Sequence, residues 1–243
     1  MDEQKPNIRF EDFIQQLPEK FSVLQEPVAI EIQMEYFRAA TRIRKAGNNQ
    51  TALDEKDNLF RHDLPMTERK NLLSRLASVA DPEAFRAIQK YAAQPDPELK
   101  DWSVLALQES RLLLESSLLE EQQVFISTGL GGKGSMLRFF VVFIHPLKAL
   151  DNLQQKILHD ELDYALKNAQ GEMESMEHFA AFSSATILMP LTMDMGQVLV
   201  SMIDECNQYG GFLEKDFLVT NIKKMNETEI REALTNRPEN PDA

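Results

Sequence analysis

The sequence predicts an α+β protein in two parts, an all-helical N-terminal part and a C-terminal two-layer α+β sandwich with a mixed sheet. Two observations support this prediction. Apolar side chains recur at helical spacing through residue 122, and after Gln123 short strand-like apolar runs alternate with amphipathic helical stretches. We therefore expect an all-helical domain over 1–122, an α+β domain over 123–235 and a disordered tail over 236–243.

Three stretches before residue 80 carry the apolar spacing of amphipathic helices. The second also alternates between apolar and polar residues, so a strand is an alternative there. We prefer a helix because the pattern persists and ends in Arg44, Lys45 and Gly47, residues typical of a helix C-terminus. A long polar connection, with room for one short helix, separates the second stretch from the third. The stretches are 8–17, 28–47 and 67–79.

A helix-starting phrase occurs twice in the first part. Asp81-Pro82-Glu83 and Asp96-Pro97-Glu98 are separated by 15 residues, the length of one helix and a tight turn. Aspartate suits an N-cap, proline the first helical turn, and glutamate the positive end of the helix dipole. The phrase predicts helices over 82–93 and 97–119. Each helix has an apolar stripe that it cannot cover alone, so the helices must stack.

On these residues, 67–115 resembles HEAT-like helical repeats, of the short kind also seen in phycobilisome-lyase-type proteins. The phrases Asp81-Pro82-Glu83-Ala84 and Asp96-Pro97-Glu98-Leu99-Lys100 carry the resemblance. It implies a protein-binding bundle or solenoid. It does not imply a lyase activity, because no active-site residue of such enzymes has a match here.

The second part alternates strands and helices. A hairpin followed by two helix crossovers predicts a mixed sheet with helices packed on it. In outline this order is similar to ferredoxin-like α+β domains. Gly171 is expected to end the first of the helices. The expected strands are 124–127, 137–144, 179–191 and 212–222, and the expected helices are 149–169, 194–208 and 227–234.

Composition and charge limit the class of protein. The 243-residue chain has a net charge of −13, which repels phosphate backbones, so we expect no nucleic-acid partner. The most apolar run, Phe139–Ile144, is far shorter than the roughly 20 residues that span a bilayer, so we expect no membrane partner. The single cysteine, Cys206, excludes a disulfide framework, and the polar N-terminus lacks a secretory signal. Both features favour a cytoplasmic protein, and no cofactor is predicted.

The sharpest local motif is the glycine-rich segment 127–135. Successive glycine amides can cradle an anion, with a lysine charge and a serine hydroxyl beside them. The segment is no nucleotide P-loop, because its lysine precedes a glycine and a strand follows instead of a helix. The alternative is a hairpin tip in which glycines supply positive φ. The candidate anion-binding residues are Gly129, Gly131, Gly132, Lys133, Gly134 and Ser135.

No catalytic or metal-binding residue is predicted. None of the four histidines stands at metal-ligand spacing from another histidine or the cysteine. His178 has Glu174 and Glu177 nearby, and a carboxylate could orient its imidazole as a general base. No nucleophile is evident beside it, so a hydrolase is a distant alternative and whether the chain is an enzyme stays open.

The remaining candidates concern binding to other proteins. Arg38, Arg42 and Lys45 share one helical face. Met193 and Met195 lie beside a crossover turn, and flexible thioethers suit adaptable binding surfaces. With Trp102 these residues form the candidate interaction surface. We therefore expect an interaction or scaffolding protein that binds a protein partner or another copy of itself. The alternative is a sensor that binds a small molecule or nucleotide phosphate at 129–135.

Overall fold

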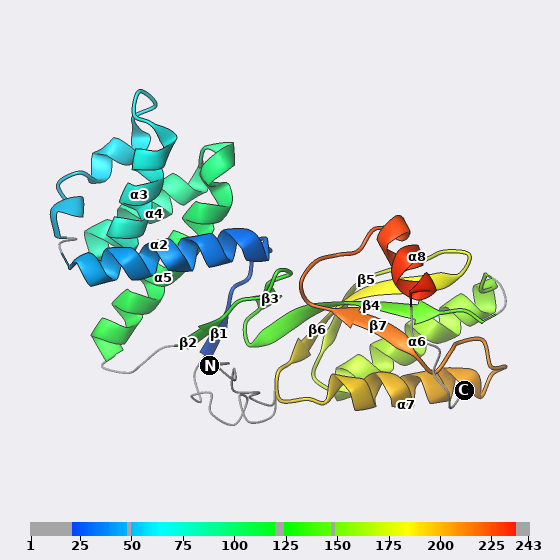
Figure 1. The fold of residues 1–243 in the computed structure, drawn as a ribbon. Helices are drawn as coiled ribbons and strands as arrows, with labels where there is room; N and C mark the ends of the chain where they lie inside the picture. The colour runs from blue at the N-terminus through cyan, green and yellow to red at the C-terminus, as the bar shows by residue number, and fades with distance from the viewer. Residues whose placement is uncertain (1–20, 48–49, 120–123, 147–148, 237–243) are drawn as a thin grey trace, which may run out of the picture. The chain divides into compact units, whose positions relative to one another are not determined.

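The computed structural model describes residues 21–47, 50–119, 124–146 and 149–236 (Figure 1). The chain divides into two compact units, Met1–Ser127 and Thr128–Ala243. The helix expected over 8–17 lies outside the described residues, and so does the tail expected over 236–243 except for Asn236, which ends the last helix. Whether the two units are independent domains, as expected from the sequence, stays a prediction.

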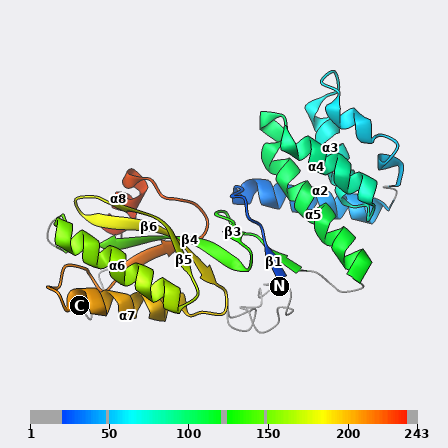
Figure 2. The same ribbon diagram turned by 180° about the vertical axis from the view of Figure 1, so that it is seen from behind.

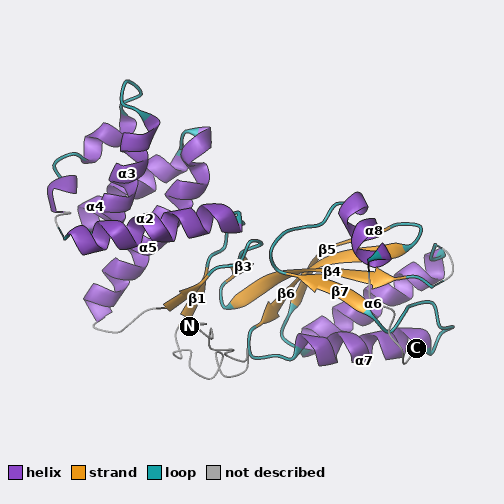
Figure 3. Cartoon of the chain, viewed as in Figure 1, coloured by secondary structure: helices purple, strands orange, loops and turns teal. Residues whose placement is uncertain are grey.

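The described part of the first unit is mainly helical, and the strands are concentrated in the second unit (Figure 3). The α-helices of the first unit enclose one apolar core, to which Tyr36, Leu73, Ile88 and Leu105 each contribute a buried side chain. The first of these helices packs against the last, because the Tyr36 ring meets Trp102 edge-on at 5.0 Å. The elements are β1 (Phe21–Val23), α2 (Ile30–Ala46), the 3₁₀ turns η1 (Gln50–Ala52), η2 (Lys56–Phe60) and η3 (Pro97–Leu99), α3 (Met66–Ala77), α4 (Pro82–Ala93), α5 (Lys100–Leu119) and β2 (Val124–Ile126).

The first unit is not all-helical, which corrects the sequence prediction. Strand β1 pairs in parallel with β2, with Phe21 opposite Val124. The sequence had placed the second of these strands in a hairpin with the strand after the glycine-rich turn. The Leu24 N–H extends the pairing by donating to Ile126 O at 2.9 Å. An apolar run of three residues fits either partner, and the partner here is about 100 residues away in the chain.

The two copies of the Asp-Pro-Glu phrase have different roles. Asp81 caps α4 by accepting a hydrogen bond from the Glu83 N–H at 2.6 Å. Asp96 makes no such cap. Its carboxylate instead accepts from Arg69 Nη1 and from the Tyr91 hydroxyl, both at 2.5 Å. The second phrase therefore ties α3 and α4 to the start of α5, after one 3₁₀ turn.

All pairings within the five-stranded sheet of the second unit are antiparallel, so the expected mixed sheet is wrong. The strand order is β3-β4-β6-β5, and β7 also pairs with β4. Strand β5, which forms a hairpin with β6 directly after α6, was not predicted from the sequence. The elements are β3 (Gly132–Lys133), β4 (Met136–Ile144), α6 (Asn152–Asn168), β5 (Glu172–His178), β6 (Phe182–Pro190), α7 (Met195–Asn207), β7 (Phe217–Thr220) and α8 (Glu227–Thr235).

Helices cover both faces of this sheet (Figures 1 and 2). Helices α6 and α7 pack on one face, where Val141 and Ile187 meet Leu162 and Leu199. Helix α8 packs on the other face, where Ile230 joins a smaller apolar cluster with Phe140, Val142 and Phe182. The buried strands β4 and β6 therefore separate two cores.

The last strand is shorter than the expected 212–222. Phe212 and Leu213 are buried, but they precede β7 instead of belonging to it. The Asn207 side chain holds Leu213 at both backbone groups, donating to its oxygen at 2.9 Å and accepting from its N–H at 3.0 Å. This side chain occupies the backbone groups that a strand neighbour would use.

Helix α6 does not use Gly171 as its left-handed end residue. That residue is Gln170, with φ 58°, and its N–H donates to Lys167 O at 3.1 Å. The Gly171 N–H donates to Leu166 O at 2.7 Å, which completes a Schellman motif. Gly171 has a different requirement, because a Cβ there would lie 2.6 Å from Leu188 O on β6.

Candidate functional site

Helices α6 and α7 lie side by side on their sheet face (Figure 2). Their side chains leave a groove of about 470 Å³ between them. Tyr164 on α6 and Met193 before α7 form its apolar walls, with Val198 and Met202 from α7. Tyr164 is 64% exposed and Met193 is 37% exposed, whereas Met202 is buried beneath them. The groove therefore exposes apolar surface above a packed floor.

The charged side chains that line the groove are all acidic. They are Glu161 on α6, Asp194 at the start of α7 and Glu205 near its end. Among the described residues, no lysine or arginine lines the groove. The α6 lysines Lys156 and Lys167 form ion pairs with aspartates of their own helix. The groove thus combines an apolar floor with a negative potential.

Capping side chains fix the starts of the two helices that flank the groove. Asp151 begins α6 with a capping box, and Asp194 begins α7 by accepting from the Gln197 N–H at 3.0 Å. Below the groove, Cys206 is buried in the core. Its burial, assisted by the Glu161 charge, raises the pKa of the thiol to about 12. The cysteine is therefore a structural thiol.

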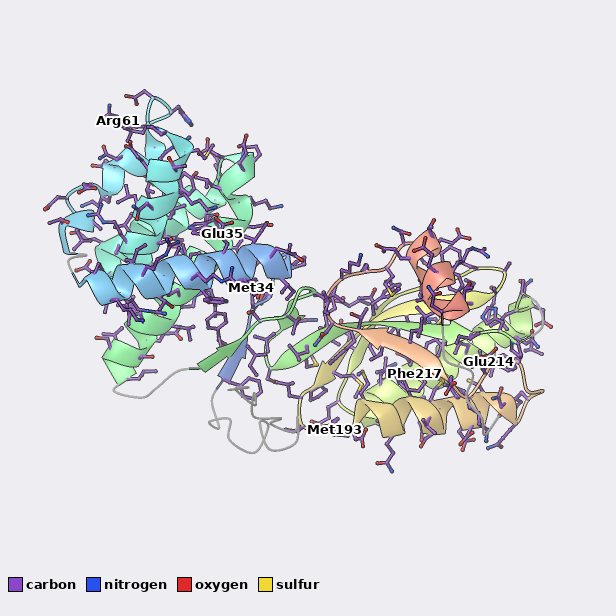
Figure 4. All side chains as sticks on the ribbon, in the orientation of Figure 1. Met34, Glu35, Arg61, Met193, Glu214 and Phe217 are labelled. Carbon is purple, nitrogen blue, oxygen red and sulfur yellow. The ribbon has the colours of Figure 1, made fainter. Side chains whose placement is uncertain are left out.

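The structure brings one of the two predicted methionines to this groove. Met193 lies just before α7 and lines the groove (Figure 4), whereas Met195 is half-buried and packs on the core. Sequence reasoning missed Tyr164, Glu161 and Glu205. Tyr164 carried a usable signal, since it is an aromatic residue of α6 that lies outside the stripe of Leu158, Leu162 and Leu166.

The other interaction candidates do not join this site. Arg38, Arg42 and Lys45 are exposed on α2, in the first unit. Trp102 is 4% exposed and cannot belong to a surface. Its indole N–H donates to Ser74 Oγ at 2.9 Å, which satisfies its polar atom inside the helical core.

The first half of the glycine-rich segment is packed. Gly129, Gly131 and Gly132 are buried, and a Cβ at Gly129 would lie 1.7 Å from the Ile222 backbone oxygen. The Gly131 N–H, one of the amides expected to cradle an anion, donates to Thr128 O at 3.2 Å. Close backbone packing explains the glycine at 129.

The second half of the segment is the tip of the β3–β4 hairpin. Gly134, with φ 62°, and Ser135 join the two strands, and a glycine at the first turn position is typical of a type II′ turn. Lys133 Nζ lies 2.7 Å from Glu172 Oε2, so a carboxylate already pairs with its charge. Anion binding at 129–135 stays a prediction. The ion pair of Lys133 with Glu172 argues against it.

His178 is close to a serine instead of the expected carboxylates. Its Nδ1 lies 2.8 Å from Ser183 Oγ, and His145 Nε2 lies 2.9 Å from the same oxygen. Burial lowers the pKa of His145 to about 4 and lowers that of His178, so both rings are neutral at pH 7. Ser183 is fully buried. A neutral imidazole could activate a hydroxyl, but a substrate cannot reach this one without opening of the fold.

Comparison with known proteins gives no family for the chain. Neither the scan against protein-family models nor the search of curated proteins found a match. Within the described residues, no helix has the length and apolar character needed to cross a bilayer. In the same part of the chain, no group of three or more histidine, cysteine, aspartate or glutamate side chains could hold a metal ion.

Proposed function

We propose that this chain is an interaction protein whose α6–α7 groove binds a cationic amphipathic helix of a protein partner. One observation carries the proposal: the groove joins exposed apolar surface to three carboxylates, and no lysine or arginine of the described residues lines it. An amphipathic helix with lysine or arginine beside its apolar stripe would match both features.

The same charges disfavour a second copy of this chain as the occupant. Two grooves placed face to face would bring Glu161, Asp194 and Glu205 against their own copies. Like charges in an interface are unfavourable, and the net charge of −13 adds to the repulsion. A separate cationic partner avoids both effects.

We also infer how each unit relates to a known type of fold. The order strand-helix-strand-strand-helix-strand from β4 to β7, with both crossover helices on one face, supports a ferredoxin-like two-layer core to which β3 and α8 are additions. The packed pair α4 and α5 supports at most one HEAT-like unit. The contact of α2 with α5 argues for a closed bundle over a longer solenoid.

A cytoplasmic location is proposed because Cys206 is a free thiol.

The test uses the full chain and a labelled amphipathic helical peptide of leucine and lysine, roughly 18 residues long so that it can form a helix. We expect micromolar binding by fluorescence anisotropy that weakens as salt is raised, because the carboxylates are near the surface. The double variant Glu161→Gln/Glu205→Gln should weaken binding by about tenfold or more. Tyr164→Ala should also weaken it, by removing apolar contact.

The matched control is Asp204→Asn/Glu232→Gln, which changes the net charge equally outside the groove. It should leave the affinity within about twofold of the parent protein. Equal weakening by both double variants would mean attraction to the overall charge, and the proposal would be wrong. A stable dimer that Tyr164→Ala dissociates would replace the proposed partner by a second copy.

A further inference from the structure

Helix α8 lies on the opposite sheet face (Figure 1). A second cavity lies beneath this helix. It has a volume of about 140 Å³ and is lined by β4, β5, β6, the loop before α8 and α8 itself. A water molecule occupies about 30 Å³ in the liquid. The cavity therefore has room for a few waters or one small organic molecule. Phe140, Phe179 and Ile230 supply its apolar walls.

Strand register places hydroxyl groups together on the floor of this cavity. Thr186 on β6 is paired with Phe140 on one side and with Ser175 on the other, and Ser184 is paired with Glu177. Paired residues share a sheet face, and so do residues two apart in a strand. Three hydroxyls and one carboxylate therefore face the same space, and all four residues line the cavity.

Two of these hydroxyls belong to buried residues and line the cavity. Ser184 is 4% exposed and Thr186 is 2% exposed. Among the described residues, neither side-chain oxygen has a hydrogen-bond partner, yet both residues line the cavity. Neither oxygen is among the buried polar atoms that lack a partner, so both stay accessible from the cavity. A polar occupant of the cavity can therefore form a hydrogen bond with each hydroxyl.

Charges of both signs line the same cavity. Glu177 and Lys224 contribute one charge each and form no ion pair with each other in the described structure. The other lining carboxylate, Glu227, is already paired with Arg231 Nη2 at 2.7 Å. An occupant of this cavity thus meets hydroxyls, one carboxylate without an ion-pair partner and one ammonium.

We propose that the cavity binds a small zwitterion of the α-amino-acid class. The ligand ammonium group pairs with Glu177, and its carboxylate pairs with Lys224 and accepts hydrogen bonds from Ser184 and Thr186. A volume of about 140 Å³ admits alanine, serine or threonine and excludes the aromatic amino acids. The site lies on the sheet face opposite the α6–α7 groove, so it is independent of the proposed partner site.

The test is calorimetric titration of the full chain with alanine, serine and threonine, together with three comparison compounds. Lactate lacks the ammonium group, ethylamine lacks the carboxylate, and tryptophan exceeds the cavity. We expect millimolar or tighter binding of the small amino acids, with each comparison compound weaker by about tenfold or more. Glu177→Gln, Lys224→Gln and Thr186→Val should each reduce the affinity for alanine by about tenfold.

Lys215→Gln and Glu232→Gln are the matched controls, since they remove the same charges from exposed positions outside the cavity. Both should keep the parent affinity. Absence of binding up to ~10 mM ligand would overturn the proposal. It would also be overturned if lactate or ethylamine bound as tightly as alanine, or if a correctly folded Thr186→Val variant bound alanine unchanged.

Discussion

Replacing Tyr36 by phenylalanine should destabilise the helical unit, and by more at pH 7 than at pH 4. The Tyr36 hydroxyl donates to Glu109 Oε2 at 2.5 Å, and Arg44 Nη1 lies 2.6 Å from Glu109 Oε1. Tyr36 is fully buried and Glu109 is 9% exposed, so bulk water does not replace the lost donor. A hydrogen bond to a charged group contributes about 1.5–3 kcal/mol, and one between neutral groups about 0.5–1.5 kcal/mol.

The pH dependence follows from the Glu109 carboxyl. Burial raises its pKa above the ordinary 4.5, while the Tyr36 hydrogen bond and Arg44 lower it. A carboxyl whose pKa is raised by folding contributes stability below the unfolded-state pKa and loses it as pH rises through the folded-state pKa. Removing the hydroxyl raises the folded-state pKa further, so the variant loses more between pH 4 and pH 7. We expect a loss of about 2 kcal/mol at pH 7 and about 1 kcal/mol at pH 4.

The assay is urea unfolding followed by tryptophan fluorescence. Trp102 is the single tryptophan of the chain, and its ring lies 5.0 Å from that of Tyr36, so the signal reports on the helical unit. Tyr164→Phe makes the same chemical change at an exposed position of the other unit and should cost nothing measurable. Equal losses at both pH values, or an equal loss from Tyr164→Phe, would contradict a stabilising hydrogen bond from Tyr36 to the charged Glu109.

Three further predictions concern the second unit. Gln170→Gly should stabilise it by about 0.5 kcal/mol, because relief of about 1–2 kcal/mol of left-handed strain exceeds the chain entropy of about 0.5–1 kcal/mol. Gly171→Ala should destabilise it by about 1–3 kcal/mol, since the new Cβ meets Leu188 O; hydrogen exchange of the β6 amides measures both effects. Cys206, with its thiol pKa raised to about 12, should react with a thiol reagent at pH 8 only as fast as the unit opens. Rapid stoichiometric labelling of the folded chain would contradict that burial.

Local signals predicted the helices better than the pairing of the strands. The stripes behind α3, α4, α5, α6 and α7 are long enough for the helical period to stand out. Strand β2 is three residues long, and nothing within it distinguishes a hairpin partner from β1 at the other end of the unit. Likewise, Asp81 and Asp96 look equivalent in sequence. Only the tertiary structure shows that Arg69 and Tyr91 lie beside Asp96 and not beside Asp81.

The candidate groove, too, could be predicted only in part from the sequence. Predicting α6 and α7 was sufficient to place Met193 near a helix start, and its thioether identified it as a surface candidate. The walls from Tyr164 and Glu205 depend on which faces of the two helices the sheet leaves open. Which helix faces stay open depends on the sheet beneath the helices, and β5 is a strand of that sheet.

Strand β5 was missed for a physical reason that also creates the second cavity. Its register shifts between Met173 and Ser175, so one extra residue, Glu174, interrupts the alternation that predicts a strand. Met173 and Met176 both face the core although they are three apart, because the bulge absorbs one residue. The same shift sets Ser175 and Glu177 on the opposite face, in the rows of Thr186 and Ser184. Without the bulge, Ser175 and Glu177 would point into the α6–α7 core, and the polar floor would be lost.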